Sequence, residues 1–160
     1  MTYPRIMIAA PKSGSGKTYI TCALLQALQM RGYLVGAFKS GPDYIDPMFH
    51  REVLGVDSEN LDLFFSDAEE LTKNFIRHTE GADLVIAEGV MGYYDGVGGT
   101  TSRASAYDLA SVTDTPVILI VNSRGMSVSL AAYVKGFLEY KNDSHIQGVI
   151  FNQMSPMLYP

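Results

Sequence analysis

The sequence is poor in cysteine, in tryptophan and in basic residues. It has one cysteine and no tryptophan in 160 residues. A single cysteine excludes an internal disulfide framework and any metal site built from several cysteines. Lysine and arginine number 12 against 17 aspartate and glutamate residues, which gives a net charge of −5. We therefore expect no nucleic-acid partner, because such a surface needs an excess of positive charge.

The sequence also lacks the patterns of membrane insertion and of secretion. No apolar stretch approaches the ~20 consecutive residues that a membrane-spanning helix needs. The first residues include Pro4, and their apolar run leads into a glycine-rich turn rather than into a small-residue cleavage site. We expect a cytoplasmic protein with no membrane partner.

Apolar runs alternate with helical patterns along the whole chain. The expected strands are residues 5–10, 33–39, 84–88, 116–122 and 146–152. The expected helices are residues 18–29, 45–55, 68–79, 105–112 and 127–140. Residues 58–66 fit neither pattern, and we expect a loop there.

The expected strands are apolar throughout rather than alternately apolar and polar. Such runs are typical of parallel strands that are buried on both faces. With helices between them, they predict an α/β fold with a doubly wound, mostly parallel sheet of about five strands. Residues 1–160 are expected to form one domain. No helix follows the last expected strand, so we expect this domain to be incomplete at its C-terminus.

A glycine-rich stretch, PKSGSGKT, lies between the first expected strand and the first expected helix. It has the Gly-Lys-Thr ending of a phosphate-binding P-loop, with Pro11 in place of the usual first glycine. Lys17 would reach the β- and γ-phosphates of a nucleotide, and the Thr18 hydroxyl would bind Mg²⁺. The alternative is a glycine turn before an ordinary helix. The predicted nucleotide-binding residues of this P-loop NTPase are Lys12, Ser13, Gly14, Ser15, Gly16, Lys17, Thr18 and Tyr19.

Lys12 is a second lysine, five residues before Lys17. In one large branch of P-loop proteins an early lysine of this kind neutralises phosphate charge, often from the neighbouring subunit of a dimer. Lys12 therefore indicates a possible homodimer. The alternative is a solvated loop lysine.

Two further stretches follow the second and third expected strands: KSGPDYIDPMFH, residues 39–50, and EGVMGYYDG, residues 88–96. Together with AAPKSGSGKT, they resemble three consecutive motifs of the N-terminal, ATP-binding part of the cobyrinic acid a,c-diamide synthases. SRGMSVSLAAYVKGF and GVIFN also look like that family, so the resemblance spans nearly all of residues 5–152. It implies an ATP-dependent conversion of corrin-ring carboxylates to carboxamides in cobalamin biosynthesis, through an acyl phosphate and with Mg²⁺.

The resemblance also implies roles for residues at the ends of the expected strands. The candidate catalytic residues are Lys17, Lys39, Asp43, Asp46 and Asp95. The candidate Mg²⁺ ligands are Thr18, Asp46 and Glu88. The candidate substrate contacts are Tyr44, His50 and Tyr94, and the candidate adenine contact is Asn152.

Plainer structural roles remain open for several of these residues. Asp43 and Asp46 could be turn or helix-cap residues, and Asp95 before a glycine could belong to an ordinary turn. His50 could lie in the core or on the surface, and Asn152 could simply end a strand.

The sequence departs from the family pattern in two ways. Family members usually have an aspartate where this chain has Asn122, so an acidic role is absent there. The family also has a glutamine amidotransferase domain that releases ammonia, and no matching cysteine nucleophile occurs here; Cys22 is expected to be a buried core residue. We therefore expect ammonia from a glutamine amidotransferase domain or subunit, or from solution.

Two other functions compete with this interpretation. A ligase similar to dethiobiotin synthetase would share the P-loop, Lys39 and carboxylate phosphorylation. A dimeric nucleotide switch similar to the partitioning ATPases would share the P-loop but usually has Lys-Gly-Gly in it. The GPDYIDP and MGYYDG stretches favour the corrin enzyme over both.

Overall fold

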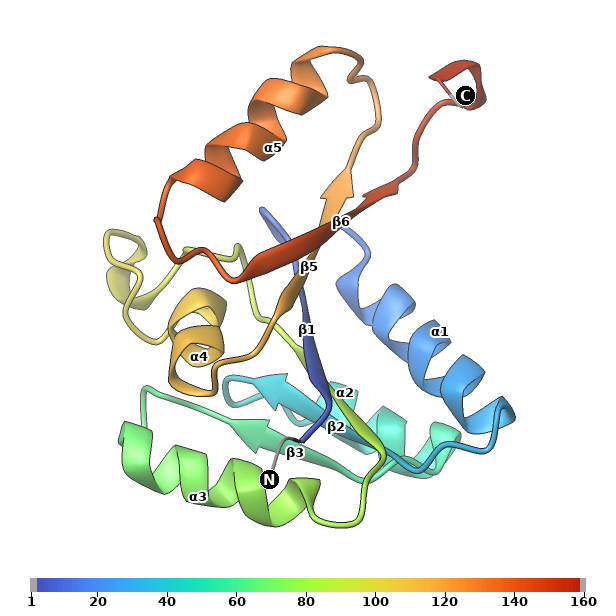
Figure 1. Ribbon diagram of the computed structural model, residues 1–160, viewed down its shortest axis with the longest axis vertical. Helices are drawn as coiled ribbons and strands as arrows, with labels where there is room; N and C mark the ends of the chain where they lie inside the picture. The colour runs from blue at the N-terminus through green and yellow to red at the C-terminus, as the bar shows by residue number, and fades with distance from the viewer. Residues whose placement is uncertain (1–2, 159–160) are drawn as a thin grey trace.

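A computed structural model describes residues 3–158 of the chain as a six-stranded parallel sheet with helices on both faces (Figure 1). The strand order is β3-β2-β4-β1-β5-β6, and every neighbouring pair is parallel. The strands are β1 (Arg5–Ala9), β2 (Val35–Ser40), β3 (Ser58–Leu61), β4 (Leu84–Glu88), β5 (Val117–Asn122) and β6 (Ile146–Asn152). The predicted doubly wound α/β fold is confirmed.

The structure has one strand more than the about five that were predicted. Residues 58–66 were expected to form a loop, but Ser58–Leu61 form β3, which pairs with β2 at one edge of the sheet. The sequence SENL has one apolar residue, Leu61, so it shows no apolar run that would predict a strand. Its pairing rests mainly on backbone hydrogen bonds, which leave no apolar pattern in the sequence.

The helices are close to those expected. They are α1 (Lys17–Met30), α2 (Ile45–Phe49), α3 (Ala68–Thr79), α4 (Ala106–Val112) and α5 (Ser129–Glu139). The π-helical turn η1 (His50–Leu54) continues α2, and the short 3₁₀ turns are η2 (Val97–Gly99) and η3 (Pro156–Leu158). In residues 3–158 no helix is both long enough and apolar enough to cross a membrane.

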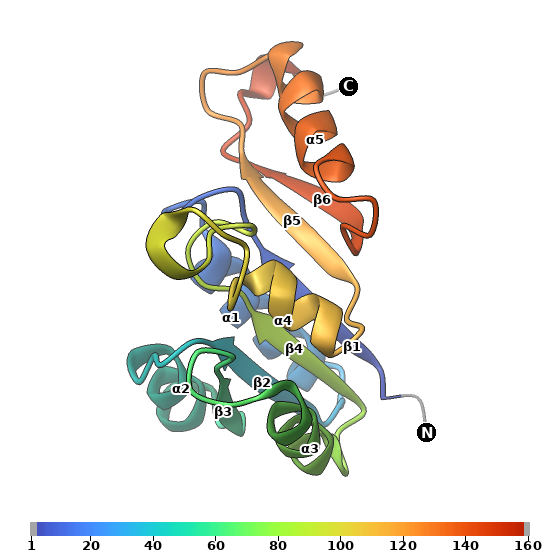
Figure 2. The same cartoon turned by 90° about the vertical axis from the view of Figure 1, so that its left-hand side faces the viewer.

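The helices divide between the two faces of the sheet (Figures 1 and 2). On one face, α1 and η1 pack through Leu25 and Leu54 against Ile8, Ile86 and Ile120 of the sheet. On the other face lie α3, α4 and α5, whose buried apolar residues are Leu71, Phe75, Ala106, Leu109, Ala110 and Leu130. Cys22 is only partly buried, so the expectation of a core cysteine was wrong: Thr21 and Leu25 are the α1 residues that face the sheet.

The connections leave β1 and β4 in opposite directions. From β1 the chain crosses β4 to reach β2, whereas from β4 it crosses β1 to reach β5. Open parallel sheets bind ligands at the carboxyl ends of their strands, where the strand order reverses in this way. The P-loop after β1 and the loop after β4 both start at this reversal.

Candidate active site

The P-loop occupies residues 10–16, between β1 and α1. Gly14 and Gly16 have φ values of 74° and 96°, in the left-handed region that residues with a Cβ avoid. A Cβ at Gly16 would also lie 2.4 Å from Nδ2 of Asn152. Both the backbone angle and the lack of space therefore require glycine at position 16.

The start of α1 is open to an anion. Gly16 is its N-cap residue and has no side chain to cap the helix, and the first turn contains no acidic residue. The first N–H groups of a helix need acceptors and carry partial positive charge. Phosphate oxygens would satisfy both needs.

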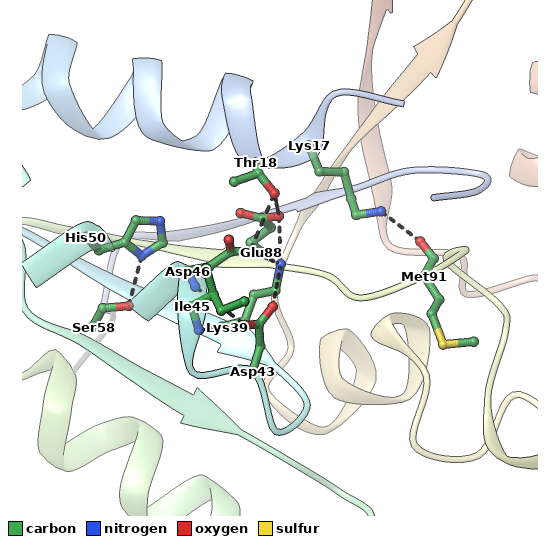
Figure 3. Close-up of polar contacts among 10 residues, drawn as sticks. All are labelled: Lys17, Thr18, Lys39, Asp43, Ile45, Asp46, His50, Ser58, Glu88 and Met91. Atoms are coloured by element: carbon green, nitrogen blue, oxygen red, sulfur yellow. Dashed lines mark hydrogen bonds and ion pairs between the residues drawn. The ribbon is translucent and has the colours of Figure 1, made fainter. Parts of the chain in front are cut away.

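Lys17 is buried and lies across the P-loop toward the loop after β4 (Figure 3). Its Nζ donates a hydrogen bond of 2.8 Å to the carbonyl oxygen of Met91. Met91 has a φ of 50°, an uncommon backbone state for a residue with a side chain. Burial lowers the pKa of Lys17, and the charge of Lys39 acts in the same direction, against the opposite effect of Glu88.

Four side chains from four elements meet beside the P-loop (Figure 3). The Thr18 hydroxyl donates to Oε1 of Glu88 at 2.7 Å and lies 3.4 Å from Oδ2 of Asp46. Lys39 Nζ donates to the same two oxygens, at 2.8 Å for Glu88 and 2.5 Å for Asp46. The structure thus brings together Thr18, Lys39, Asp46 and Glu88, as the sequence motifs predicted.

Lys39 stays charged in this cluster. Burial acts to lower its pKa, but the charge of Glu88 and the hydrogen bonds with Asp46 and Glu88 outweigh burial and raise it. A permanent positive charge is therefore held next to the P-loop, between two carboxylates.

The oxygen groups of the cluster fit Mg²⁺. Glu88 is 0% exposed, and its Oε2 has no hydrogen-bond partner among the described residues. Within residues 3–158 no three His, Cys, Asp or Glu side chains are arranged to hold a metal ion. A magnesium ion here would therefore use Thr18, Asp46 and Glu88 together with water and phosphate oxygens, which is the usual way proteins bind it.

Asp43, Tyr44, Lys12 and Tyr19 lie around this cluster rather than in it. Asp43 Oδ1 accepts hydrogen bonds from the backbone of Ile45 and Asp46, so it holds the start of α2, while its Oδ2 is 3.8 Å from Lys39 Nζ. The side chains of Lys12, Tyr19 and Tyr44 are exposed.

His50 lies in the interior. It is fully buried, and its Nδ1 is 3.0 Å from the Ser58 hydroxyl. Nε2 has no hydrogen-bond partner in the part of the chain that the structure describes. Burial lowers the pKa of His50, against the effect of the Glu88 charge. This is the core position that the sequence left open, and it does not favour direct contact with a substrate.

Asp95 and Tyr94 belong to the loop after β4. Asp95 is exposed and close enough for its charge to act on Lys17. Tyr94 donates its phenol hydrogen to the carbonyl of Phe137 at 2.8 Å and stacks on the Phe137 ring. Asp95 therefore lies beside the P-loop, and Tyr94 lies beside α5.

Asn122 is the last residue of β5, and Asn152 is the last residue of β6. Asn152 Nδ2 donates to the carbonyl of Ser15 at 2.9 Å, so the predicted adenine contact has its amide nitrogen committed to the P-loop. Asn122 donates from Nδ2 to Gln153 and accepts the N–H of Arg124 with Oδ1. It supports the turn after β5, a role that needs no negative charge.

The residues of the main site line a single cleft of about 450 Å³. Its walls are the P-loop, Lys39, Asp43, Asp46, Glu88 and the following residues 89–91. The sequence analysis missed the Met91 carbonyl, whose contact with Lys17 depends on a backbone angle that no motif reveals. It also missed the aromatic residues of α5, because their helical spacing is the same as that of core residues.

The comparisons with known proteins agree with this geometry. The model of one family, described as the CobQ/CobB/MinD/ParA nucleotide binding domain, matches residues 6–158.

Curated relatives are similar over nearly the whole chain. A cobyrinate a,c-diamide synthase of Listeria innocua is 45% identical over 152 residues, which are 94% of this chain and 34% of the relative. One of Sulfurisphaera tokodaii is 46% identical over 154 residues, 96% of this chain and 34% of the relative. A hydrogenobyrinate a,c-diamide synthase of Brucella ovis is 46% identical over 149 residues, 92% of this chain and 34% of the relative. The chain thus spans about a third of the length of these relatives.

Proposed function

Because the chain belongs to the family of CobQ/CobB/MinD/ParA nucleotide binding domains, we propose that it uses ATP to activate corrin-ring carboxylates for conversion to carboxamides. The resemblance to cobyrinic acid a,c-diamide synthases is confirmed by relatives of that name at about 45% identity. Those names favour a corrin acceptor over the substrate of a dethiobiotin synthetase and over a nucleotide switch.

One observation carries the proposal: the contact of Lys39 with both Asp46 and Glu88 beside the P-loop. Lys17 and Thr18 alone would suit any nucleotide-binding protein. A second buried lysine from β2, held charged by two carboxylates, adds positive charge next to the place of the terminal phosphate. Phosphoryl transfer is accelerated mainly by positioning and by such electrostatic stabilisation.

Different residues of the site bind the phosphate groups and the magnesium ion. The P-loop amides and the start of α1 bind the phosphate groups, and Lys17 moves from Met91 to the β- and γ-phosphates. Thr18, Asp46 and Glu88 hold Mg²⁺, which when bound neutralises phosphate charge. Lys39 keeps the two carboxylates in place and faces the transferring group.

The proposed reaction has two steps. An oxygen of the acceptor carboxylate bonds to the γ-phosphorus while the bond from that phosphorus to ADP breaks. Ammonia then attacks the carbonyl carbon of the acyl phosphate, and phosphate leaves. Asp95 is exposed beside Lys17, a suitable position from which to orient ammonia or accept its proton.

We propose that ammonia comes from a glutamine amidotransferase domain or subunit, or from solution. Burial raises the pKa of Cys22, so this thiol is poorly suited to act as the nucleophile of a glutaminase. Lys12 is exposed and is therefore available to a second copy of the chain. A homodimer in saturating MgATP, measured by light scattering, would support that role, and a monomer would contradict it.

The proposed function is tested by mass spectrometry of cobyrinic acid incubated with this chain, MgATP and an ammonium salt. Each carboxylate converted to a carboxamide lowers the mass by about 1 Da, since NH₂ replaces OH after phosphoryl activation. Product that requires both ATP and Lys17, judged with Lys17→Ala, would support the proposal. If MgATP binds but no mass change occurs with ammonium, the proposed amidation by this chain is contradicted.

A further inference from the structure

A second hollow, separate from the phosphate cleft, lies between the loop after β4 and α5. It is a groove of about 490 Å³. The loop contributes Tyr94 and Asp95, and α5 contributes Tyr133, Gly136 and Phe137. Tyr140, just after α5, completes that wall.

The α5 side of the groove is lined by a cluster of aromatic rings. Tyr94 stacks on Phe137 with 5.6 Å between ring centroids and an interplanar angle of 21°. Tyr140 lies 4.9 Å from Tyr94, and Tyr133 lies 5.4 Å from Phe137. The hydrogen bond from the Tyr94 phenol to the Phe137 carbonyl fixes the loop against the helix. The surface is therefore already formed before any ligand arrives.

The opposite side of the groove is polar but has no positive charge. Its residues are Gly99, Thr100, Thr101 and Ser102, and neither lysine nor arginine lines the groove. Burial also raises the pKa of Tyr94 to about 12, so its phenol stays neutral. A site of this kind suits the uncharged, flat part of a ligand, with hydroxyl groups available for hydrogen bonds.

The groove adjoins the phosphate cleft through residues 91–95. Met91 receives the hydrogen bond from Lys17, and a Cβ placed on Gly92 would lie 2.6 Å from the Pro11 carbonyl and 2.2 Å from Asp95 Oδ2. The loop therefore lies directly against the P-loop at one end and lines the groove at the other. A ligand in the groove could extend a carboxylate past Asp95 toward the phosphate site.

We infer that this groove binds the flat, uncharged body of the acceptor and directs one of its carboxylates toward the nucleotide. The inference rests on the proposed function, which it extends by assigning the acceptor a place. The acceptor class is a planar macrocycle that carries carboxylates on flexible side chains. Its ring contacts the aromatic cluster of Tyr94, Phe137 and Tyr140, and its polar edge faces residues 100–102.

Gly136 gives a direct test of this assignment. It lies within α5, where glycine is less favourable than alanine, and a Cβ added there would meet no atom within 4 Å. Gly136→Leu would therefore add an isobutyl group to the wall of the groove, with space for its Cβ. Ala131→Leu adds a leucine to the same helix at an exposed position that does not line the groove, so it is the matched control.

The experiment measures the binding of cobyrinic acid and of MgADP to wild type and to both variants by titration calorimetry. We expect Gly136→Leu to weaken cobyrinic acid binding by at least about tenfold and to leave MgADP binding as in wild type. Ala131→Leu should change neither. If Gly136→Leu binds cobyrinic acid as wild type does, the groove assignment is overturned. If wild type binds MgADP but no cobyrinic acid, the proposed function fails, and the groove assignment fails with it.

Discussion

At the residue scale, Lys39 has the most demanding environment in the site. Its ammonium group is buried and within hydrogen-bond distance of two carboxylates, one of which, Glu88, is 0% exposed. Removing one partner of a buried ion pair lowers stability strongly, since the remaining charge is left buried without a partner. Lys39 therefore supports the fold as well as the proposed chemistry.

Lys39→Met should lower the free energy of unfolding by about 3 kcal/mol, because Glu88 and Asp46 would be left facing each other without a cation. Urea denaturation at neutral pH measures this change. The control is Lys73→Met, which removes a lysine from an exposed pair with Glu69 and should cost less than about 1 kcal/mol. Equal losses in the two variants would contradict the prediction.

His50 predicts how stability depends on pH. Burial lowers its pKa in the folded protein, so the unfolded chain takes up a proton at a higher pH than the folded protein does. Stability is therefore full above the unfolded pKa of about 6.5 and falls as pH decreases below it. Unfolding free energies at about pH 7 and about pH 5.5 should differ more in wild type than in His50→Asn. The prediction is wrong if both proteins lose the same amount.

The sequence motifs predicted which charged residues lie in the site, but not which way every neighbouring side chain points. Thr18, Lys39, Asp46 and Glu88 follow buried strands or the P-loop, so parallel topology alone brings them to one edge of the sheet. His50 belongs to the same motif as Lys39, yet it points inward to Ser58. Motif spacing predicts which residues come close, whereas the direction of a side chain depends on packing that only the folded chain reveals.

At the element scale, the strands divide into those that their sequences predict and one that its sequence does not. β1, β2, β4 and β5 are apolar because they lie inside the sheet with helices on both faces. β6 is also apolar in sequence, although it is an edge strand and only partly buried. Within residues 3–158, β3 pairs with one strand, β2, and its four residues include one apolar side chain, Leu61, so its sequence carries no comparable pattern. The order of the strands could not be predicted from the sequence either, because the five expected strands have similar apolar compositions and each could neighbour any other.

The N-terminus of α3 gives an element-scale prediction. Its cap is Asp67, whose Oδ1 accepts the N–H of Glu70 at 2.8 Å, whereas the neighbouring Ser66 makes no such contact among the described residues. Asp67→Ala should lower the free energy of unfolding by about 1 kcal/mol. Ser66→Ala, measured by the same denaturant titration, should lower it by less than about 0.5 kcal/mol. A larger loss for Ser66→Ala would contradict the assignment of the cap.

At the scale of the whole molecule, the P-loop depends on the strand farthest from it in the chain. Asn152 at the end of β6 holds the Ser15 carbonyl, and its amide fills the space that a side chain at position 16 would need. The adenine contact of Asn152 stays a prediction, whereas the contact of its amide nitrogen with Ser15 could not be read from the motif.

Asn152→Ala should therefore weaken MgADP binding about fivefold, through the loss of one hydrogen bond that shapes the P-loop. Titration calorimetry measures the dissociation constant. The control is Gln153→Ala, which removes the neighbouring side chain that accepts from Asn122 and should leave MgADP binding unchanged. Equal effects of the two substitutions would show that the P-loop does not depend on Asn152.

The bond between Asn152 and Ser15 joins residues 137 positions apart, and this separation has a consequence in time. A ribosome adds about 5–20 residues per second, so Asn152 is synthesised roughly ten seconds after Ser15. Over that interval the P-loop has left the ribosome without the strand that fixes its shape. Nucleotide stabilises only a chain that can bind it. We therefore expect the newly made chain to gain less protection from cellular ATP until β6 is complete.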